Sequence, residues 1–143
     1  MEMRVSFVTL AVRNLAASRR FYVDGLGWEP AMEVPGEVLM FQVGAHVVLS
    51  LWDKRQFEAE VGPIVHGEGV APFTLAHNVA TRPEVDAVLA TARRAGADPV
   101  HDGQERAWGG YTGYFADPDG FRWEIAWNPG PIGQVVLPPP ATG

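Results

Sequence analysis

The sequence contains no cysteine and a single lysine, Lys54. Without thiols the chain cannot form disulfides, iron–sulfur clusters, cysteine-ligated zinc sites or thiol nucleophiles. Basic residues are also scarce, because 11 Lys and Arg stand against 17 Asp and Glu, for a net charge of −6. A broad basic face for nucleic acid is therefore not expected. No apolar run of about 18 residues is present, so the sequence predicts no membrane span and a cytoplasmic protein.

What is present fits one globular domain. The chain has 143 residues, of which 47% are hydrophobic and 20% are charged, and this is the composition of a folded, water-soluble protein. We interpret residues 4–129 as a single domain and the proline-rich residues 130–143 as an extended or disordered tail. Within the domain we expect a first module at residues 4–52, a connector at 53–72 and a second module at 73–128.

The first module has the pattern of a strand, a helix and three further strands. Asn14 is predicted as the N-cap of the helix, and Gly25 as the C′ glycine that ends it. Alternating and β-branched residues predict the strands at residues 5–12, 28–32, 38–43 and 46–52.

The second module repeats this order. Its helix is predicted to open at Arg82, with proline in the first turn, and to end at Gly96. Strands are predicted at residues 73–80, 98–101, 111–116 and 121–127, the last two joined by a turn at 117–120. The repeated order predicts an α+β fold of two βαβββ modules, whose curved sheets enclose a cavity suited to a small ligand.

Several local strings carry a resemblance to a known family. They are VTLAVRNLAAS at 8–18, FY at 21–22, GLGW at 25–28, WGGY at 108–111, YFADPDG at 114–120 and WE at 123–124. In these positions the chain resembles the vicinal oxygen chelate (VOC) superfamily, the group of glyoxalase I, bleomycin-resistance proteins and extradiol dioxygenases. The resemblance covers residues 4–129, and it implies paired βαβββ modules around a cavity and a homodimer.

The resemblance also implies where a catalytic metal would bind. Metal-dependent members take one ligand from each of four strands, and these positions fall here on Phe7, Ser50, Thr74 and Glu124. Phenylalanine has no lone pair and the two hydroxyls are weak neutral ligands, so only Glu124 fits. One carboxylate does not hold a catalytic divalent ion. We therefore expect no metal cofactor, unless another strand register supplies different ligands.

Glu124 is the leading functional candidate. By strand alternation, Trp123 and Ile125 pack under the helix, so Glu124 points into the cavity. A carboxylate between aromatic walls suits a general base or a receptor for a cationic ligand. The structural alternative is that Glu124 forms an ion pair with Arg13 or Arg106.

Other residues are predicted to give the cavity its shape and stacking surfaces, although the aromatic ones could equally fill a core or a dimer interface. These residues are Phe7, Trp52, Thr74, Trp108 and Tyr114. His77 alternates with Thr74 onto the opposite face, where we expect a structural, hydrogen-bonded histidine. Gly109 and Gly110 favour a β-bulge or a close backbone approach.

The sequence thus predicts recognition of a small, partly aromatic or apolar molecule without a catalytic metal, as in the drug-binding branch of the family. The alternative is an enzyme, of lyase, isomerase or dioxygenase-like type. It would be metal-free with Glu124 as the base, or metal-dependent through ligands in another register. Binding without turnover would indicate the first function, and turnover that Glu124→Gln abolishes would indicate the second. No nucleic-acid or membrane partner is expected.

Overall fold

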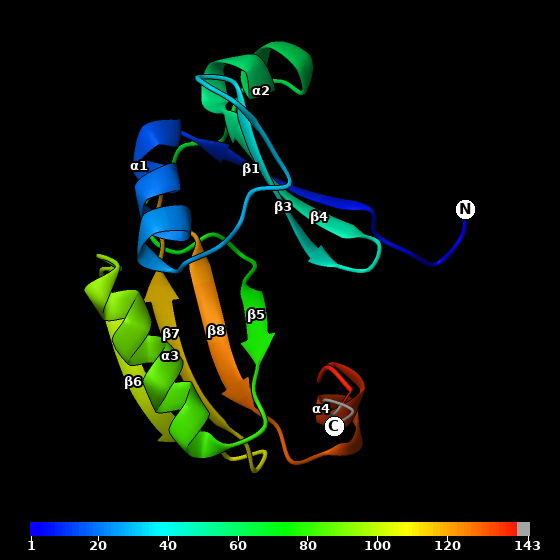
Figure 1. Cartoon of the computed structure of the whole chain (residues 1–143), viewed down its shortest axis with the longest axis vertical. Coiled ribbons are helices and arrows are strands. Elements are labelled where there is room, and N and C mark those ends of the chain that lie inside the picture. Colours follow the sequence, from blue (N-terminus) through cyan, green and yellow to red (C-terminus); the bar gives the residue numbers. More distant parts are fainter. Residues whose placement is uncertain (140–143) are drawn as a thin grey trace. The chain divides into compact units, whose positions relative to one another are not determined.

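A computed structural model describes residues 1–139, and the last residues of the predicted tail, 140–143, lie outside this range. The chain divides into two compact units, Met1–Gly69 and Val70–Gly143, each with one four-stranded sheet (Figure 1). In each unit a strand, a helix and three strands follow one another, which confirms the predicted α+β fold of two βαβββ modules. None of the helices within residues 1–139 combines the length and apolar character that a membrane crossing needs.

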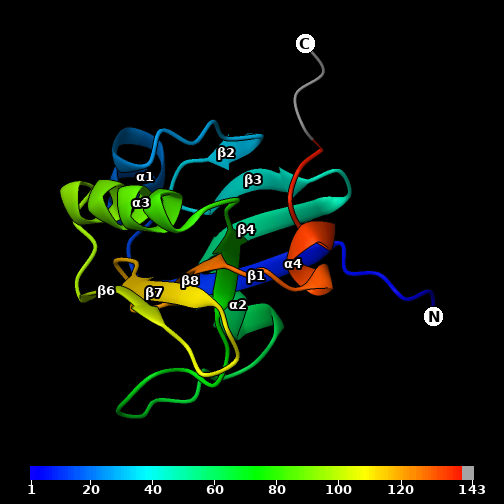
Figure 2. The same ribbon diagram turned by 90° about the horizontal axis from the view of Figure 1, so that it is seen from below.

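The first unit builds a mixed sheet in the order β1-β4-β3-β2, in which β1 runs parallel to β4 and the other pairs are antiparallel. The short β2 lies at the edge, beside β3 (Figure 2). The elements are β1 (Phe7–Val12), α1 (Leu15–Arg19), the π-helical η1 (Arg20–Gly25), β2 (Met32–Val34), β3 (Val38–Gly44), β4 (Val47–Asp53) and α2 (Lys54–Glu60).

The helical segment of the first unit begins where the sequence predicts and ends later. The Asn14 side chain accepts a hydrogen bond from the backbone N–H three residues on, at 3.0 Å, and so caps α1. At the other end, the Leu26 N–H donates to the Phe21 carbonyl five residues earlier. This wider turn carries the helical backbone through Gly25, and the left-handed residue is Gly27, with φ of 76°. The prediction of Gly25 as the C′ glycine is therefore wrong by two residues.

Aromatic packing displaces the second predicted strand. Residues 28–32 were expected to be extended and paired, but pairing begins only at Met32. The Trp28 ring instead lies 5.3 Å, centroid to centroid, from both Tyr22 and Phe41. Tyr22 and Phe41 are fully buried, so Trp28 contributes to the core beneath the helix rather than to the sheet.

A helix interrupts the predicted connector at residues 53–72. Asp53 is its N-cap, because one carboxylate oxygen accepts a hydrogen bond from the Arg55 N–H at 3.0 Å. The Arg55 guanidinium donates to the same oxygen at 3.1 Å. This side-chain hydrogen bond is the main reason that the pKa of Asp53 lies below its ordinary value. The prediction of a connector overlooked this signal, an aspartate directly before a helix-forming stretch.

The second unit builds a sheet in the order β5-β8-β7-β6, again with one parallel pair, β5 with β8. The long helix α3 lies across one face of this sheet (Figure 1). The elements are β5 (Leu75–Asn78), α3 (Arg82–Arg94), β6 (Val100–Glu105), β7 (Tyr111–Ala116), β8 (Arg122–Trp127) and α4 (Pro131–Val135).

The predicted signals at both ends of α3 are confirmed. The helix begins at Arg82 with proline in its first turn, and Gly96, with φ of 100°, follows its end. A reciprocal capping box of Thr81 and Glu84, which was not predicted, adds to the start. Leu89, on the buried side of the helix, sits so close to Gly113 of β7 that a Cβ there would collide with it. The helix and the sheet can pack this tightly only because β7 has a glycine at the contact.

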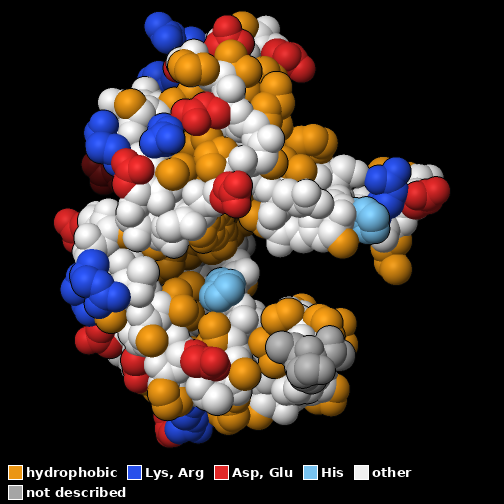
Figure 3. Space-filling model, viewed as in Figure 1, with side chains coloured by type: hydrophobic (Ala, Val, Ile, Leu, Met, Phe, Trp, Pro, Cys, Tyr) orange, Lys and Arg blue, Asp and Glu red, His pale blue; other side chains and the backbone are white. Residues whose placement is uncertain are grey.

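The predicted tail contains a short helix, so its description as an extended or disordered arm is wrong for residues 131–135. Gly133 of α4 packs against the backbone of Asn128, where a Cβ would have no room. Three apolar side chains of this segment remain exposed, and Figure 3 shows the hydrophobic surface that gathers there. They are Ile132, Val135 and Val136.

The turn between β7 and β8 follows the predicted chemistry. One carboxylate oxygen of Asp117 accepts hydrogen bonds from the N–H groups of Asp119 and Phe121, each at 2.9 Å. Gly120 adopts the positive φ, 86°, that closes the turn. This short connection fixes the register of the two strands, so that Tyr114 lies directly opposite Glu124.

Candidate functional site

The candidate site lies on one face of the β5–β8 sheet. We use "open face" for the side of each sheet opposite α1 in the first unit and opposite α3 in the second. Ile125 is buried and pairs with Gly113, the residue that contacts α3, so Glu124 belongs to the open face as predicted. Its cross-strand neighbours are Tyr114 on β7 and Ala76 on β5.

Tyr114 and Glu124 form the central contact of this face. The Tyr114 hydroxyl donates a hydrogen bond of 2.5 Å to one carboxylate oxygen, Oε2, of Glu124. Both side chains are half-buried. Burial in the first place, and then this hydrogen bond, raise the pKa of Tyr114. The tyrosine is therefore a protonated donor at neutral pH, and it holds the carboxylate in a fixed orientation.

Arg106 is anchored beside this pair by Thr112. Its Nε donates to the Thr112 hydroxyl at 2.6 Å and its Nη2 to the Thr112 carbonyl at 3.2 Å. Thr112 itself is only 1% exposed, so the anchor is rigid. The guanidinium carbon lies 5.8 Å from the centre of the Tyr114 ring. Arg106, Thr112, Tyr114 and Glu124 are referred to below as the polar cluster.

The polar cluster corrects one reading of Glu124. The sequence left open an ion pair between Glu124 and Arg106, but within residues 1–139 the hydrogen bonds of Arg106 go to Thr112 and its head group makes no ion pair. The hydrogen-bond partner of Glu124 is Tyr114. Thr112 was missed altogether, although it alternates with Tyr114 along β7 and so shares its face.

The loop that carries Arg106 is a tight turn. The Arg106 N–H donates to the Gly110 carbonyl at 2.8 Å, and the Gly109 N–H donates to the Arg106 carbonyl at 2.9 Å. The close contact is at Gly110 alone and is made by the Trp108 ring, which lies where a Cβ would be, so the prediction of a close backbone approach is not confirmed. Gly109 has open space around it and adopts a positive φ of 97°. Trp108 itself is 57% exposed, so the loop presents an aromatic ring to solvent.

The remaining predicted residue of the second unit, Thr74, does not join the cluster. It is exposed and precedes β5 by one residue. The β5 residue in register with Glu124 is Ala76, two positions further on. His77, expected to be structural and hydrogen-bonded, is exposed, and its side chain makes no hydrogen bond within residues 1–139.

The predicted residues of the first unit lie on the open face of its own sheet. Phe7 is 54% exposed there. Trp52 packs its ring edge-on against Phe57 of α2 and donates from Nε1 to the Gln56 side chain at 3.3 Å. Ser50 is 3% exposed and pairs in register with Thr9 on β1.

The four family ligand positions do not fit a divalent metal. In register, Ser50 pairs with Thr9 and Glu124 with Ala76. Phe7 lies two residues before Thr9 on the same face of β1, and Thr74 lies two residues before Ala76, ahead of β5. Neither register adds a histidine or a second carboxylate to Glu124. Within residues 1–139, no three acidic or histidine side chains gather closely enough to share an ion. The expectation of a site without metal stays a prediction.

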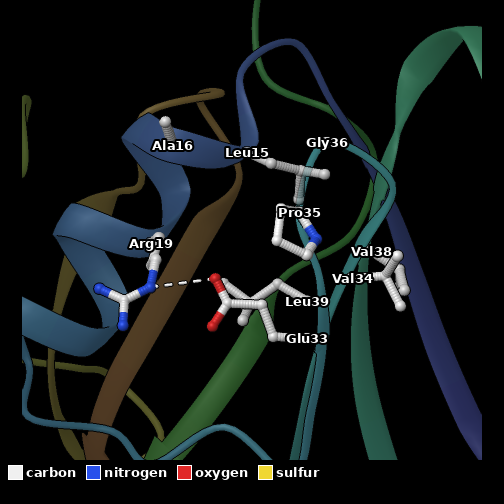
Figure 4. Close-up of a pocket in the computed structure, with 9 residues that line it drawn as sticks. All are labelled: Leu15, Ala16, Arg19, Glu33, Val34, Pro35, Gly36, Val38 and Leu39. Carbon is white, nitrogen blue, oxygen red and sulfur yellow. Dashed lines mark hydrogen bonds and ion pairs between the residues drawn. The ribbon is translucent and has the colours of Figure 1, made fainter.

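The first unit also holds a cavity of about 210 Å³ between α1 and the β2–β3 turn (Figure 4). An ion pair borders it, in which Arg19 Nε donates to a Glu33 carboxylate oxygen at 3.0 Å. None of the predicted site residues lines it. The lining residues are Leu15, Ala16, Arg19, Glu33, Val34, Pro35, Gly36, Val38 and Leu39.

The second unit has a larger groove of about 580 Å³, formed by the end of β5, the start of α3 and the chain after α4. Apart from His77, its lining contains no side chain that the sequence analysis singled out. The polar cluster is not part of it. The groove is lined by His77, Asn78, Val79, Ala80, Glu84, Gln134, Leu137, Pro138 and Pro139.

Comparison with known proteins agrees with this architecture. The family described as Glyoxalase/Bleomycin resistance protein/Dioxygenase superfamily matches residues 4–125. The chain therefore belongs to this superfamily, as its sequence motifs indicated. A glyoxalase-related enzyme from Fulvimarina pelagi has a crystal structure with 36% sequence identity, coverage of 90% of both chains and a TM-score of 0.81.

More distant structures share the fold alone. A glyoxalase/bleomycin resistance protein/dioxygenase from Nocardioides is 23% identical over 91% of this chain and 89% of its own, with a TM-score of 0.74. A lactoylglutathione lyase from Agrobacterium tumefaciens is 23% identical over 90% and 96%, with a TM-score of 0.68. Functionally curated proteins give no match. Because this fold serves many chemistries, function has to be argued from the polar cluster.

Proposed function

We propose that this protein binds a small, partly aromatic or apolar molecule on the open face of the β5–β8 sheet, without a catalytic metal. The observation that carries the proposal is the hydrogen bond of 2.5 Å from Tyr114 to Glu124. It fixes a half-buried carboxylate beside an aromatic ring and leaves the second oxygen, Oε1, available to a ligand. A fixed carboxylate next to a ring favours a protonated amine attached to an apolar group.

The strength of such a contact sets the expected effect of removing it. A hydrogen bond to a charged group contributes about 1.5–3 kcal/mol, because part of its energy repays the loss of water. Every 1.4 kcal/mol corresponds to tenfold in affinity. Replacing Glu124 by the neutral glutamine is therefore expected to weaken binding of an aromatic amine by roughly 10- to 100-fold.

The experiment uses chelator-treated protein and naphthylmethylamine, an apolar ring with one protonated amine. Isothermal titration calorimetry is expected to show saturable binding to the unmodified chain and the predicted loss in Glu124→Gln. The matched control is Asp102→Asn. Asp102 pairs with Arg93 of α3 at 3.0 Å, so this substitution also removes one negative charge, but at a site that is not on the open face. Equal binding by Glu124→Gln and the unmodified chain would contradict the proposal.

The second candidate function is a metal-free lyase or isomerase with Glu124 as the general base. The same Tyr114–Glu124 hydrogen bond supports it, because it holds the carboxylate in one orientation and a general base has to lie within hydrogen-bond reach of the proton that it abstracts. The similar protein from Fulvimarina pelagi is described as a glyoxalase-related enzyme. Turnover that disappears in Glu124→Gln, while affinity for the reactant persists, would favour catalysis over binding. Homodimer formation stays a prediction, and light scattering of the purified chain tests it.

A further inference from the structure

The open face of the second sheet carries two opposite charges, Arg106 and Glu124, that do not form an ion pair with each other. Arg106 and Glu124 both lie next to Tyr114, the first over its ring and the second at its hydroxyl. Both are half-buried. Within residues 1–139, no carboxylate lies within ion-pair distance of the Arg106 guanidinium. A cation and an anion therefore remain available on one small surface.

Each charge has its own anchor. Thr112 holds Arg106 through Nε and Nη2, and this leaves Nη1 without a partner in residues 1–139. Tyr114 holds Glu124 through Oε2 and leaves Oε1 without one. Because the anchors fix both groups before any ligand arrives, less conformational entropy is lost when a ligand binds.

The two atoms without a partner in the described part of the chain, Arg106 Nη1 and Glu124 Oε1, indicate which groups a ligand would need. A guanidinium presents N–H donors in a planar fork, which matches the two oxygens of a carboxylate. A carboxylate oxygen accepts from a protonated amine. The half-buried Tyr114 ring beside them adds aromatic surface that an apolar or aromatic group of a ligand can contact.

We propose that the polar cluster is a receptor for a zwitterionic aromatic molecule, in which Arg106 binds an anionic oxygen of the ligand and Glu124 binds its protonated amine. This inference rests on the proposed function and narrows it, since an amine alone would use only half of the cluster. Arg106 is then the residue that determines specificity, and Thr112 positions it.

Three probes with the same ring test the inference: naphthylmethylamine is a cation, naphthoate is an anion and naphthylalanine is a zwitterion. Calorimetry with the chelator-treated chain is expected to show naphthylalanine binding about tenfold or more tightly than either single charge, the effect of one added charge-assisted contact. Arg106→Gln should abolish this advantage without weakening naphthylmethylamine. Arg93→Gln, which removes an arginine paired with Asp102 on the α3 side, should leave all three affinities unchanged.

A second variant guards against misfolding of Arg106→Gln. Arg106→Lys keeps the charge but loses the planar fork, so it is expected to retain part of the preference for naphthylalanine. Equal affinities for naphthylalanine and naphthylmethylamine in the unmodified chain would overturn the zwitterion receptor and leave the proposed function standing. A preference that survives in both Arg106 variants would also overturn it. Failure of all three probes to bind would overturn the proposed function and this inference together.

Discussion

The two sheets share one topology and differ on their open faces. In the first unit, this face is largely apolar, with Met40 opposite Ser50. In the second unit the corresponding cross-strand pair is Tyr114 and Glu124, joined by a hydrogen bond. The faces covered by α1 and α3 contain buried apolar core residues in both units, among them Leu51 and Ile125. The repeated fold is thus maintained by the covered faces, and the open faces are free to differ in chemistry.

The largest expected effects distinguish covered from open faces. Leu51 and Ile125 are buried on the covered faces, and we expect each substitution to alanine to lower the free energy of unfolding by about 2–5 kcal/mol, because it leaves a cavity. Phe7→Ala, on an exposed position, should cost less than about 1 kcal/mol. Urea denaturation measures all three. A loss of unfolding free energy for Phe7→Ala as large as that for Leu51→Ala would contradict the conclusion that the covered faces, and not the open faces, maintain the fold.

An exchange of residues sharpens the comparison. Ser50→Glu places in the first sheet the carboxylate that Glu124 provides in the second, but without a tyrosine opposite and at a site only 3% exposed. An unpaired buried charge is expensive, so we expect a loss of about 3 kcal/mol in the free energy of unfolding. Ser50→Ala is the control for loss of the hydroxyl. Adding Met40→Tyr to Ser50→Glu should restore part of the stability. If it does not, a tyrosine opposite the carboxylate is not sufficient to stabilise it in the first sheet.

The alkaline pH dependence of stability tests the Tyr114–Glu124 contact. Because the pKa of Tyr114 is raised in the folded state, its contribution is fully present below about pH 10, the ordinary tyrosine value, and is lost as the pH rises through the folded pKa. Tyr114→Phe is expected to lose about 1–2 kcal/mol near neutral pH, and less at higher pH. Urea denaturation at several pH values measures the difference. A difference that is independent of pH would contradict the contact.

The smallest effect concerns the short helices that follow the last strand of each unit. Asp53 caps α2 with its side chain, whereas α4 starts at Gly130 without such a cap. Asp53→Ala is expected to cost about 1 kcal/mol. Because the folded pKa of Asp53 lies below the ordinary 3.8, its charge-dependent contribution is present above that pH and lost as the pH falls through the folded value. Thermal unfolding of Asp53→Ala and Asp53→Asn at neutral and acidic pH distinguishes the contribution of the helix cap from that of the negative charge.

The sequence was most informative where local chemistry decides the structure. The strand at 111–116 and the turn at 117–120 have the predicted bounds, since alternation and turn residues determine them. Alternation also placed Glu124 on the open face. The helix α2 was missed because seven residues are too few to show a clear period.

The site was harder to predict than the fold. Thr112 was missed, and Arg106 was predicted only as a possible ion-pair partner of Glu124, because the direction of a loop side chain follows from no periodicity. Only the packed turn at 106–110 and the Thr112 anchor bring its head group over Tyr114. The family-implied ligand positions at Phe7 and Thr74 stay predictions, and the pairing of Thr9 with Ser50 and of Ala76 with Glu124 is a register that the sequence could not supply, because strand pairing depends on tertiary contacts.

The turn at 117–120 has a consequence for how this protein can evolve. Substitutions on the open face alter its chemistry while the covered face keeps the fold, so they are an accessible route to new ligands. A single-residue insertion or deletion in the turn would be different, because a slip of one position exchanges the two faces of β8. It would turn Glu124 toward α3 and Ile125 toward solvent, and so remove the site and the core together. Variation within this protein's lineage is thus expected to preserve the length of this turn more strictly than the side chains of the face it supports.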